Sequence, residues 1–185
     1  MKRINQRVML TKRLLKDGLF RLIKEKDLDR ITVSELCAEA GINRATFYKH
    51  YSSPRDVLIE SGREFSENMR RATSRPDSAD DAERYLTDIC SYLYDNSETV
   101  KIYIKYNTDD SFSKMLREFN TEMLRLKGEF TPLRRVDEDS IRLVSTFLGC
   151  GGYFLLREWL MEDIKKSPAE VAGIIWRILS KEHRG

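Results

Sequence analysis

The segment Arg44–Tyr51, with the sequence RATFYKHY, gathers side chains that can donate hydrogen bonds to an anion or to the edge of a base. They are Arg44, Thr46, Tyr48, Lys49 and His50. The planar fork of an arginine fits guanine O6 and N7, and a lysine supplies a point charge for a phosphate. At helical spacing Ala45, Phe47 and Tyr51 are expected to pack inward and leave the polar groups outward. The segment is typical of a short helix that contacts double-stranded DNA.

The residues before this segment predict the elements that would hold it in place. Thr32 and Glu35 form a capping-box pattern at the start of a second helix, and Gly41 is suited to end it. Asn43 can cap the third helix. Apolar residues between Val8 and Ile23 recur at spacings of three, four and seven, which predicts a long first helix. Two short helices joined by a glycine-containing turn, with a third helix packed behind them, form a helix-turn-helix unit.

The sequence ITVSELCAEAGINRATFYKHY resembles the DNA-binding domain of the TetR/AcrR family of transcription regulators. The resemblance covers roughly residues 8–60 and rests on the capped second helix, the Ala-Gly-Ile turn and the Thr-Phe-Tyr-x-His-Tyr motif. It implies phosphate contacts by Thr32, Thr46, Tyr48 and His50, and base contacts by Arg44, Ala45 and, as a further candidate, Lys49. Ser34 and Asn43, near the starts of the two short helices, complete this part of the predicted DNA-binding set.

Two positions depart from the family pattern. The family usually has a phosphate-binding lysine three residues after the closing aromatic residue, where this chain has Pro54. The neighbouring Arg55 is the candidate to replace that lysine. The family also favours two alanines in the first helix where this chain has Asp17 and Gly18, and we expect that change to affect helix packing rather than DNA contact.

Charge is unevenly distributed along the 185 residues, although the net charge is only +3. Residues 1–56 contain 13 Lys and Arg against 7 Asp and Glu, whereas the remainder contains 20 against 23. A basic N-terminal third suggests that this end meets a polyanion. The chain has two histidines and no metal-spaced cluster, glycine-rich phosphate loop or nucleophile motif. We therefore expect no enzyme activity, no metal and no cofactor.

The cysteines and the apolar segments bear on where the protein works. Cys37, Cys90 and Cys150 are odd in number and widely spaced, which favours reduced thiols over a disulfide framework. No window of about 18 residues is continuously apolar, and the basic start lacks the apolar stretch of a signal peptide. These features predict a cytoplasmic protein without a membrane span.

Helical periodicity continues to the C-terminus and strand signals are nearly absent, so we predict an all-α fold of about nine helices. We expect a helix-turn-helix domain over residues 1–55 and a helical effector-binding and dimerisation domain over residues 56–185. Ser53-Pro54 and Ser167-Pro168 are predicted to open helices. The segment Ile141–Met161 is apolar on most of its circumference and is expected to be central and buried.

Three glycines interrupt that apolar segment: Gly149, Gly151 and Gly152. Each weakens a helix by about 1 kcal/mol relative to alanine. Close approach of another helix is the expected compensation, with a kink as the alternative. Cys150, between them, is expected to be a small core residue.

Beyond residue 60 the resemblance to the family is one of general organisation. It implies an effector pocket and a homodimer interface built by the last two helices, for which FLGCGGYFLLREWL and SPAEVAGIIWRIL are the candidates. Five aromatic residues could line such a pocket, although aromatic stripes at helical spacing also occur in plain cores: Tyr92, Tyr103, Phe112, Phe119 and Phe147.

Two functions remain open at this stage. One is a repressor that binds a pseudo-palindromic operator as a dimer and is released by an apolar or aromatic small molecule. The other is a ligand-free regulator whose C-terminal domain binds a protein partner. A cavity in that domain would favour the first function, and a solid core with an exposed apolar patch would favour the second.

Overall fold

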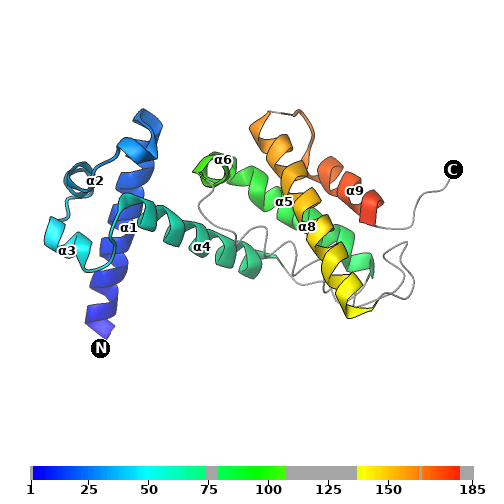
Figure 1. Ribbon diagram of the computed structural model, residues 1–185, viewed down its shortest axis with the longest axis horizontal. Helices are drawn as coiled ribbons and strands as arrows, with labels where there is room; N and C mark the ends of the chain where they lie inside the picture. The colour runs from blue at the N-terminus through cyan, green and yellow to red at the C-terminus, as the bar shows by residue number, and fades with distance from the viewer. Residues whose placement is uncertain (1, 74–78, 107–136, 163, 180–185) are drawn as a thin grey trace. The chain divides into compact units, whose positions relative to one another are not determined.

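The computed structural model describes residues 2–73, 79–106, 137–162 and 164–179 (Figure 1). Within these ranges it contains eight α-helices, one short 3-10 helix and no strand, which confirms the predicted all-α fold. One of the nine helices is predicted from the apolar spacing of Phe112, Met115, Phe119 and Met123, and it lies outside the described residues. None of the described helices is both long enough and apolar enough to span a bilayer.

The described residues form two compact units. The first comprises Met1–Phe65 together with Tyr106, and the second comprises Ser66–Lys105 and the last two described helices. Helix α4, Pro54–Ala72, begins in the first unit and ends in the second, and its start agrees with the predicted Ser-Pro signal. The division expected after residue 55 stays a prediction.

Four elements precede α4 in the first unit. They are α1 (Lys2–Glu25), the 3-10 helix η1 (Leu28–Arg30), α2 (Val33–Ala40) and α3 (Arg44–Tyr48). Helix α1 packs against α2, and α2 packs against α3. The core is formed by side chains with no exposed surface on each of these helices: Leu15, Leu19, Leu36 and Phe47.

The ends of α2 and α3 follow the predicted capping residues. The Thr32 hydroxyl accepts a hydrogen bond from the Glu35 amide (3.2 Å), while the Glu35 carboxylate accepts one from the Thr32 amide (2.9 Å). Gly41 ends α2 with φ 66°, a left-handed conformation that side chains with a Cβ rarely adopt. The Asn43 side-chain oxygen accepts from the Thr46 amide at 2.7 Å and caps α3.

Helix α3 is shorter than the RATFYKHY segment that was predicted as helix. It ends at Tyr48, because the His50 amide donates to the Phe47 carbonyl (2.9 Å) and closes a tighter turn. The Tyr51 amide donates to the same carbonyl at 3.0 Å. This turn brings the Tyr51 side chain into the core, where only 8% of it is exposed.

Gly18 lies at the contact between α1 and α2. It is buried, and a Cβ on it would lie 3.4 Å from both the Cβ and the amide nitrogen of Ala40. That spacing leaves little room for any side chain beyond a methyl group. Gly18 therefore affects the packing of α1 against α2, as we expected for this departure from the two alanines of the family.

The second unit contains α5 (Ala79–Asp95), α6 (Ser97–Tyr106) except for its last residue, α8 (Glu138–Met161) and α9 (Pro168–Leu179). Helix α5 packs along α9. Asp137 caps α8 by accepting from the Ser140 amide at 3.0 Å, and Ser167 with Glu170 forms a capping box at α9. The core includes Ile89 and Leu93 of α5, Leu156 of α8 and Val171 of α9.

The expectation that Ile141–Met161 is central and buried is wrong for one face of this helix. One face of α8 carries Leu143, Phe147 and Phe154, which are 68%, 76% and 62% exposed. Cys150 is also exposed and is not the core residue that we expected. A Cβ on Gly151 would meet nothing within 4 Å, so none of the described helices approaches it closely. The described helices thus cover only part of the apolar circumference of α8.

Gly18→Leu should lower the free energy of unfolding by about 1–3 kcal/mol, because the larger side chain forces α1 away from α2. The neighbouring Asp17→Leu is the matched control, since Asp17 is exposed and leucine is a good helix former. Urea unfolding of both variants measures the effect. Equal stability of the two variants would contradict the close contact at Gly18.

Candidate nucleic-acid interface

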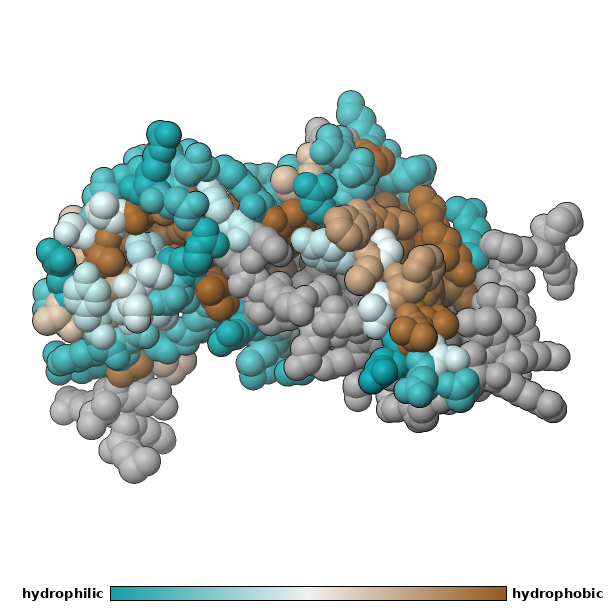
Figure 2. Space-filling model, in the orientation of Figure 1, coloured by the Kyte–Doolittle hydropathy of each residue, from teal (hydrophilic) through white to brown (hydrophobic). Residues whose placement is uncertain are grey.

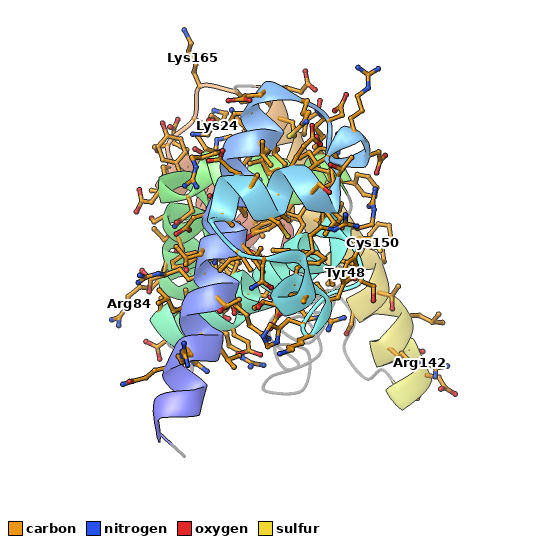
Figure 3. All side chains as sticks on the ribbon, turned by 90° about the vertical axis from the view of Figure 1, so that its left-hand side faces the viewer. Lys24, Tyr48, Arg84, Arg142, Cys150 and Lys165 are labelled. Atoms are coloured by element: carbon orange, nitrogen blue, oxygen red, sulfur yellow. The ribbon has the colours of Figure 1, made fainter. Side chains whose placement is uncertain are left out.

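All ten residues predicted to contact DNA lie in the first unit, and none is buried. Seven of them come from α2, α3 and the turn that follows α3, in the region viewed in Figure 3, where Tyr48 is labelled. Eight are exposed and two are half-exposed. The exposed residues are Thr32, Ser34, Asn43, Arg44, Ala45, Tyr48, Lys49 and Arg55, and the half-exposed ones are Thr46 and His50.

Phe47 fixes α3 to the core from behind. Its side chain has no exposed surface, and its ring meets the edge of Tyr48 (centroids 5.5 Å apart, 84° between planes). The Tyr48 ring is held by its contact with Phe47, and the residue is still 53% exposed, so it is accessible to a ligand. Ala45 is exposed, so the expectation that it packs inward is wrong. Two residues before the buried Phe47, it lies on roughly the opposite side of a helix with about 3.6 residues per turn.

The cations of the first unit fall into two groups. Lys12 pairs with Glu60 (2.6 Å), Lys26 pairs with Glu35 (2.5 Å), and Arg21 pairs with Glu39. Within the described part of the chain, neither Arg44 nor Lys49 forms an ion pair. Within the described residues, Arg44 and Lys49 therefore carry uncompensated positive charge, as do Arg13 and Lys24 of α1.

The Thr32 hydroxyl is already engaged in the capping box. It donates to the Glu35 carboxylate at 2.8 Å while it accepts from the Glu35 amide. Hydrogen bonds from Lys26 and from the Thr32 amide and hydroxyl lower the pKa of Glu35 to about 2. A phosphate contact by the Thr32 hydroxyl would have to replace its bond to Glu35.

Arg55 is held by two acceptors in the first unit. Its guanidinium pairs with Asp29 at 2.8 Å and donates to the carbonyl of Tyr106 at 3.4 Å. The Tyr106 hydroxyl in turn accepts from the Leu28 amide (3.3 Å) and donates to Asp27 (3.2 Å). Tyr106 lies 78 residues beyond Leu28, and no sequence pattern links them. A phosphate contact by Arg55 remains a prediction and would compete with Asp29.

A second cluster joins α1 to the residues around the start of α4. The Lys12 ammonium lies 5.7 Å from the centre of the Tyr51 ring and pairs with Glu60. Burial and the bond to Glu60 raise the pKa of Tyr51 far above its usual range, so its hydroxyl stays protonated. Burial acts to raise the pKa of Glu60, but bonds from Lys12 and Tyr51 outweigh it and lower that pKa overall. The cluster is structural and lies behind the exposed face of α3.

Of the five aromatic residues considered for a ligand pocket, the structure describes three. Phe147 lines an apolar cavity between α5, α8 and α9, and Tyr92 and Tyr103 are half-exposed and do not line it. Phe112 and Phe119 lie outside the described residues. No group of three or more His, Cys, Asp or Glu side chains within the described ranges is arranged to bind a metal ion.

Family comparisons agree with this arrangement of helices. Residues 80–181 match the TetR-type model described as a transcriptional regulator C-terminal region, and residues 16–60 match the model of bacterial regulatory proteins of the tetR family. The chain belongs to the TetR family. Members of this family are DNA-binding transcriptional regulators rather than enzymes.

Individual relatives of this TetR-family chain are distant. It is 19% identical over 174 residues to the uncharacterized HTH-type transcriptional regulator YxbF of Bacillus subtilis, covering 91% of this chain but only 44% of YxbF. Two solved TetR structures each superpose with a TM-score of 0.69: one from Streptococcus agalactiae (20% identical, 96% of this chain and 97% of that one) and one from Syntrophomonas wolfei (12% identical, 90% and 91%). At these identities the likeness establishes the fold alone.

Glu35→Gln should flatten the acid dependence of stability. The pKa of Glu35 is lowered from 4.5 to about 2 on folding, so its stabilisation is complete above about pH 4.5 and is lost as the pH falls toward 2. Melting temperatures between pH 6 and pH 2 measure this loss, which should be smaller in the variant than in the native chain.

Lys26→Met is the intermediate case, because it removes the bond that lowers the pKa of Glu35 most and keeps those from Thr32. Its acid dependence should fall between those of the native chain and Glu35→Gln. Identical pH profiles for all three proteins would contradict the assigned hydrogen bonds.

Proposed function

We propose that this TetR-family chain is a cytoplasmic repressor that binds a pseudo-palindromic operator as a homodimer and is released by a small molecule. The observation that carries the DNA-binding part is the face of α3. Arg44 begins α3 and Lys49 directly follows its last residue, Tyr48. All three are exposed, and neither Arg44 nor Lys49 has an ion-pair partner in the described residues. A short rigid helix with free donors suits the major groove.

The residues divide by the part of DNA that they would reach. Arg44 and Ala45 begin α3 and are proposed to meet base edges, since the first residues of a recognition helix enter the groove. Lys49 is a further candidate for the base edges. Tyr48 and His50 lie about one turn later and are proposed to bind phosphates, together with Thr32 and Thr46. Ser34 and Asn43, which are exposed near the starts of α2 and α3, are further candidates for DNA contact. Arg55 would contact DNA only if it exchanged its bond to Asp29 for one to a phosphate.

The proposed dimer interface is the uncovered face of α8 and α9. Leu143, Phe147 and Phe154 of α8 and Ile178 of α9 are between 57% and 76% exposed. Figure 2 shows this surface as a brown area over the two helices. Large exposed apolar patches on soluble proteins mark interaction sites. A second copy of the same face would cover it, and a two-fold dimer implies a pseudo-palindromic operator.

The C-terminal unit bears on the choice between the two modes of regulation. An apolar cavity between α5, α8 and α9 favours release by a small molecule. The exposed apolar face of α8 favours a second candidate function, in which the C-terminal unit binds a protein partner. The state of association separates the candidates, because a self-complementary face gives a dimer of the pure protein.

Arg44→Ala should relax discrimination at one symmetric operator position by about 1–3 kcal/mol, because it removes a base contact. Tyr48→Phe should weaken binding to all sequences about equally, because a phosphate contact carries no sequence information. Binding selection from a randomised operator library, carried out with both variants and the native chain, measures both effects.

The exposed Arg13 of α1 supplies the matched control for the loss of a positive charge. Arg13→Ala should leave the sequence preference intact. An Arg44→Ala variant that preserves the preference at every operator position would overturn the assignment of Arg44 to base contact.

Leu143→Asp combined with Phe154→Asp should raise the dimer dissociation constant at least about a hundredfold, because a dimer would bury unpaired carboxylates. Both residues are exposed in the protomer, so its own core is untouched. Ile164→Asp is the control, since Ile164 is 42% exposed and lies in the connection between α8 and α9. Sedimentation equilibrium gives the result, and a native chain that is monomeric at micromolar concentration would contradict the dimer.

A further inference from the structure

A second hollow of the second unit lies beyond the apolar cavity, where α5 and α8 end and α6 and α9 begin. The hollow and the apolar cavity share no residue among those described. The volume of the hollow is about 710 Å³, within the range of about 300–1,000 Å³ that is usual for small-molecule sites. Its described lining combines aromatic and aliphatic side chains with charged ones, so its chemistry differs from that of the apolar cavity.

Two aromatic rings form a fixed surface in this hollow. Trp159 is only 3% exposed, and its indole nitrogen donates to the Lys166 carbonyl at 3.0 Å, which fastens the connection between α8 and α9 to α8. The Tyr94 ring stacks on Trp159, with centroids 5.6 Å apart and 17° between planes, yet Tyr94 is 52% exposed. An exposed ring held by a buried one offers a flat surface on which a further aromatic ring can stack.

Lysines outnumber carboxylates in the same hollow. Among its described lining residues, Lys101, Lys165 and Lys166 are cationic and Glu98 is anionic. Lys101 pairs with Glu98 at 3.9 Å and Lys166 pairs with Glu170 at 3.8 Å, and the four side chains are at least 35% exposed. Such exposed pairs contribute little stability, so a ligand anion can replace them at small cost. Lys165 forms no ion pair with the described residues, and its side chain extends into solvent (Figure 3).

We propose that this hollow binds a small anion that carries a flat aromatic ring. The ring stacks on Tyr94, and the negative group contacts the ammonium groups of Lys101, Lys165 and Lys166. Aromatic carboxylates and phosphate esters of aromatic rings share this chemistry. All of these residues belong to the second unit, so binding requires neither a second protomer nor DNA and is separate from the proposed repressor function.

Calorimetric titration of the full chain with 1-naphthyl phosphate, 1-naphthoate, 1-naphthol and inorganic phosphate tests the ligand class. The first two probes combine a ring with a charge, and the last two carry only one of these features. We expect at least one aromatic anion to bind, and 1-naphthol and inorganic phosphate each to bind at least about tenfold more weakly than it does. The tighter of the two aromatic anions identifies the preferred charged group. No binding of either aromatic anion, or equal binding of 1-naphthol or of inorganic phosphate, would overturn the assignment.

Two variants of exposed residues test the location. Lys165→Met should weaken binding of the aromatic anion about tenfold, because it removes a charged hydrogen-bond donor. Tyr94→Leu should weaken it at least about threefold, because it removes the stacking surface. Lys24→Met and Phe154→Leu are the matched controls, since both residues are exposed and neither lines the hollow. Unchanged affinity in a folded Lys165→Met or Tyr94→Leu variant would show that the anion binds elsewhere.

The exposed cations near α3 are the other place where an anion could bind, and Arg44→Ala distinguishes the two sites. This variant should leave the affinity for the aromatic anion unchanged, because Arg44 belongs to the first unit and does not line the hollow. Lys165→Met should in turn leave operator binding unchanged. A loss of anion affinity in Arg44→Ala would place the anion at the DNA-binding face and overturn the proposal.

Discussion

A helix of five residues has no stability of its own, and α3 is such a helix. Its geometry therefore depends on the burial of Phe47, which has no exposed surface, and on the cap that Asn43 provides at 2.7 Å. Burial of a phenylalanine side chain contributes about 1.5–3 kcal/mol, more than one cap supplies. Every outward contact proposed for Arg44, Tyr48 and Lys49 depends on this one anchored side chain.

Ion pairing separates the charges that build the first unit from those available to a ligand. Carboxylates of the same unit pair with Lys12, Lys26 and Arg55, so these cations join helices or stabilise turns. Such exposed pairs add little stability individually. No carboxylate of the described residues pairs with Arg44 of α3 or with Lys49 directly after it. A phosphate backbone meets its strongest attraction where the cations are uncompensated.

In the second unit, helix α8 faces two environments. The inner side of α8 packs with α5 and α9 around the apolar cavity, while its outer side exposes Leu143, Phe147 and Phe154. Phe147 belongs to both surfaces, because it lines the cavity and is also 76% exposed.

The sequence alone determined the helical fold, the capping residues Thr32, Gly41 and Asn43, and the starts of α4 and α9, because these depend on short-range patterns of apolar and hydrogen-bonding residues. Only the tertiary structure showed that Ala45 and Cys150 are exposed, that Arg55 is held by Asp29 and Tyr106, and that α8 surrounds a cavity with α5 and α9. Periodicity shows that a helix has an apolar face, but contacts between residues distant in the sequence decide which part of that face is covered.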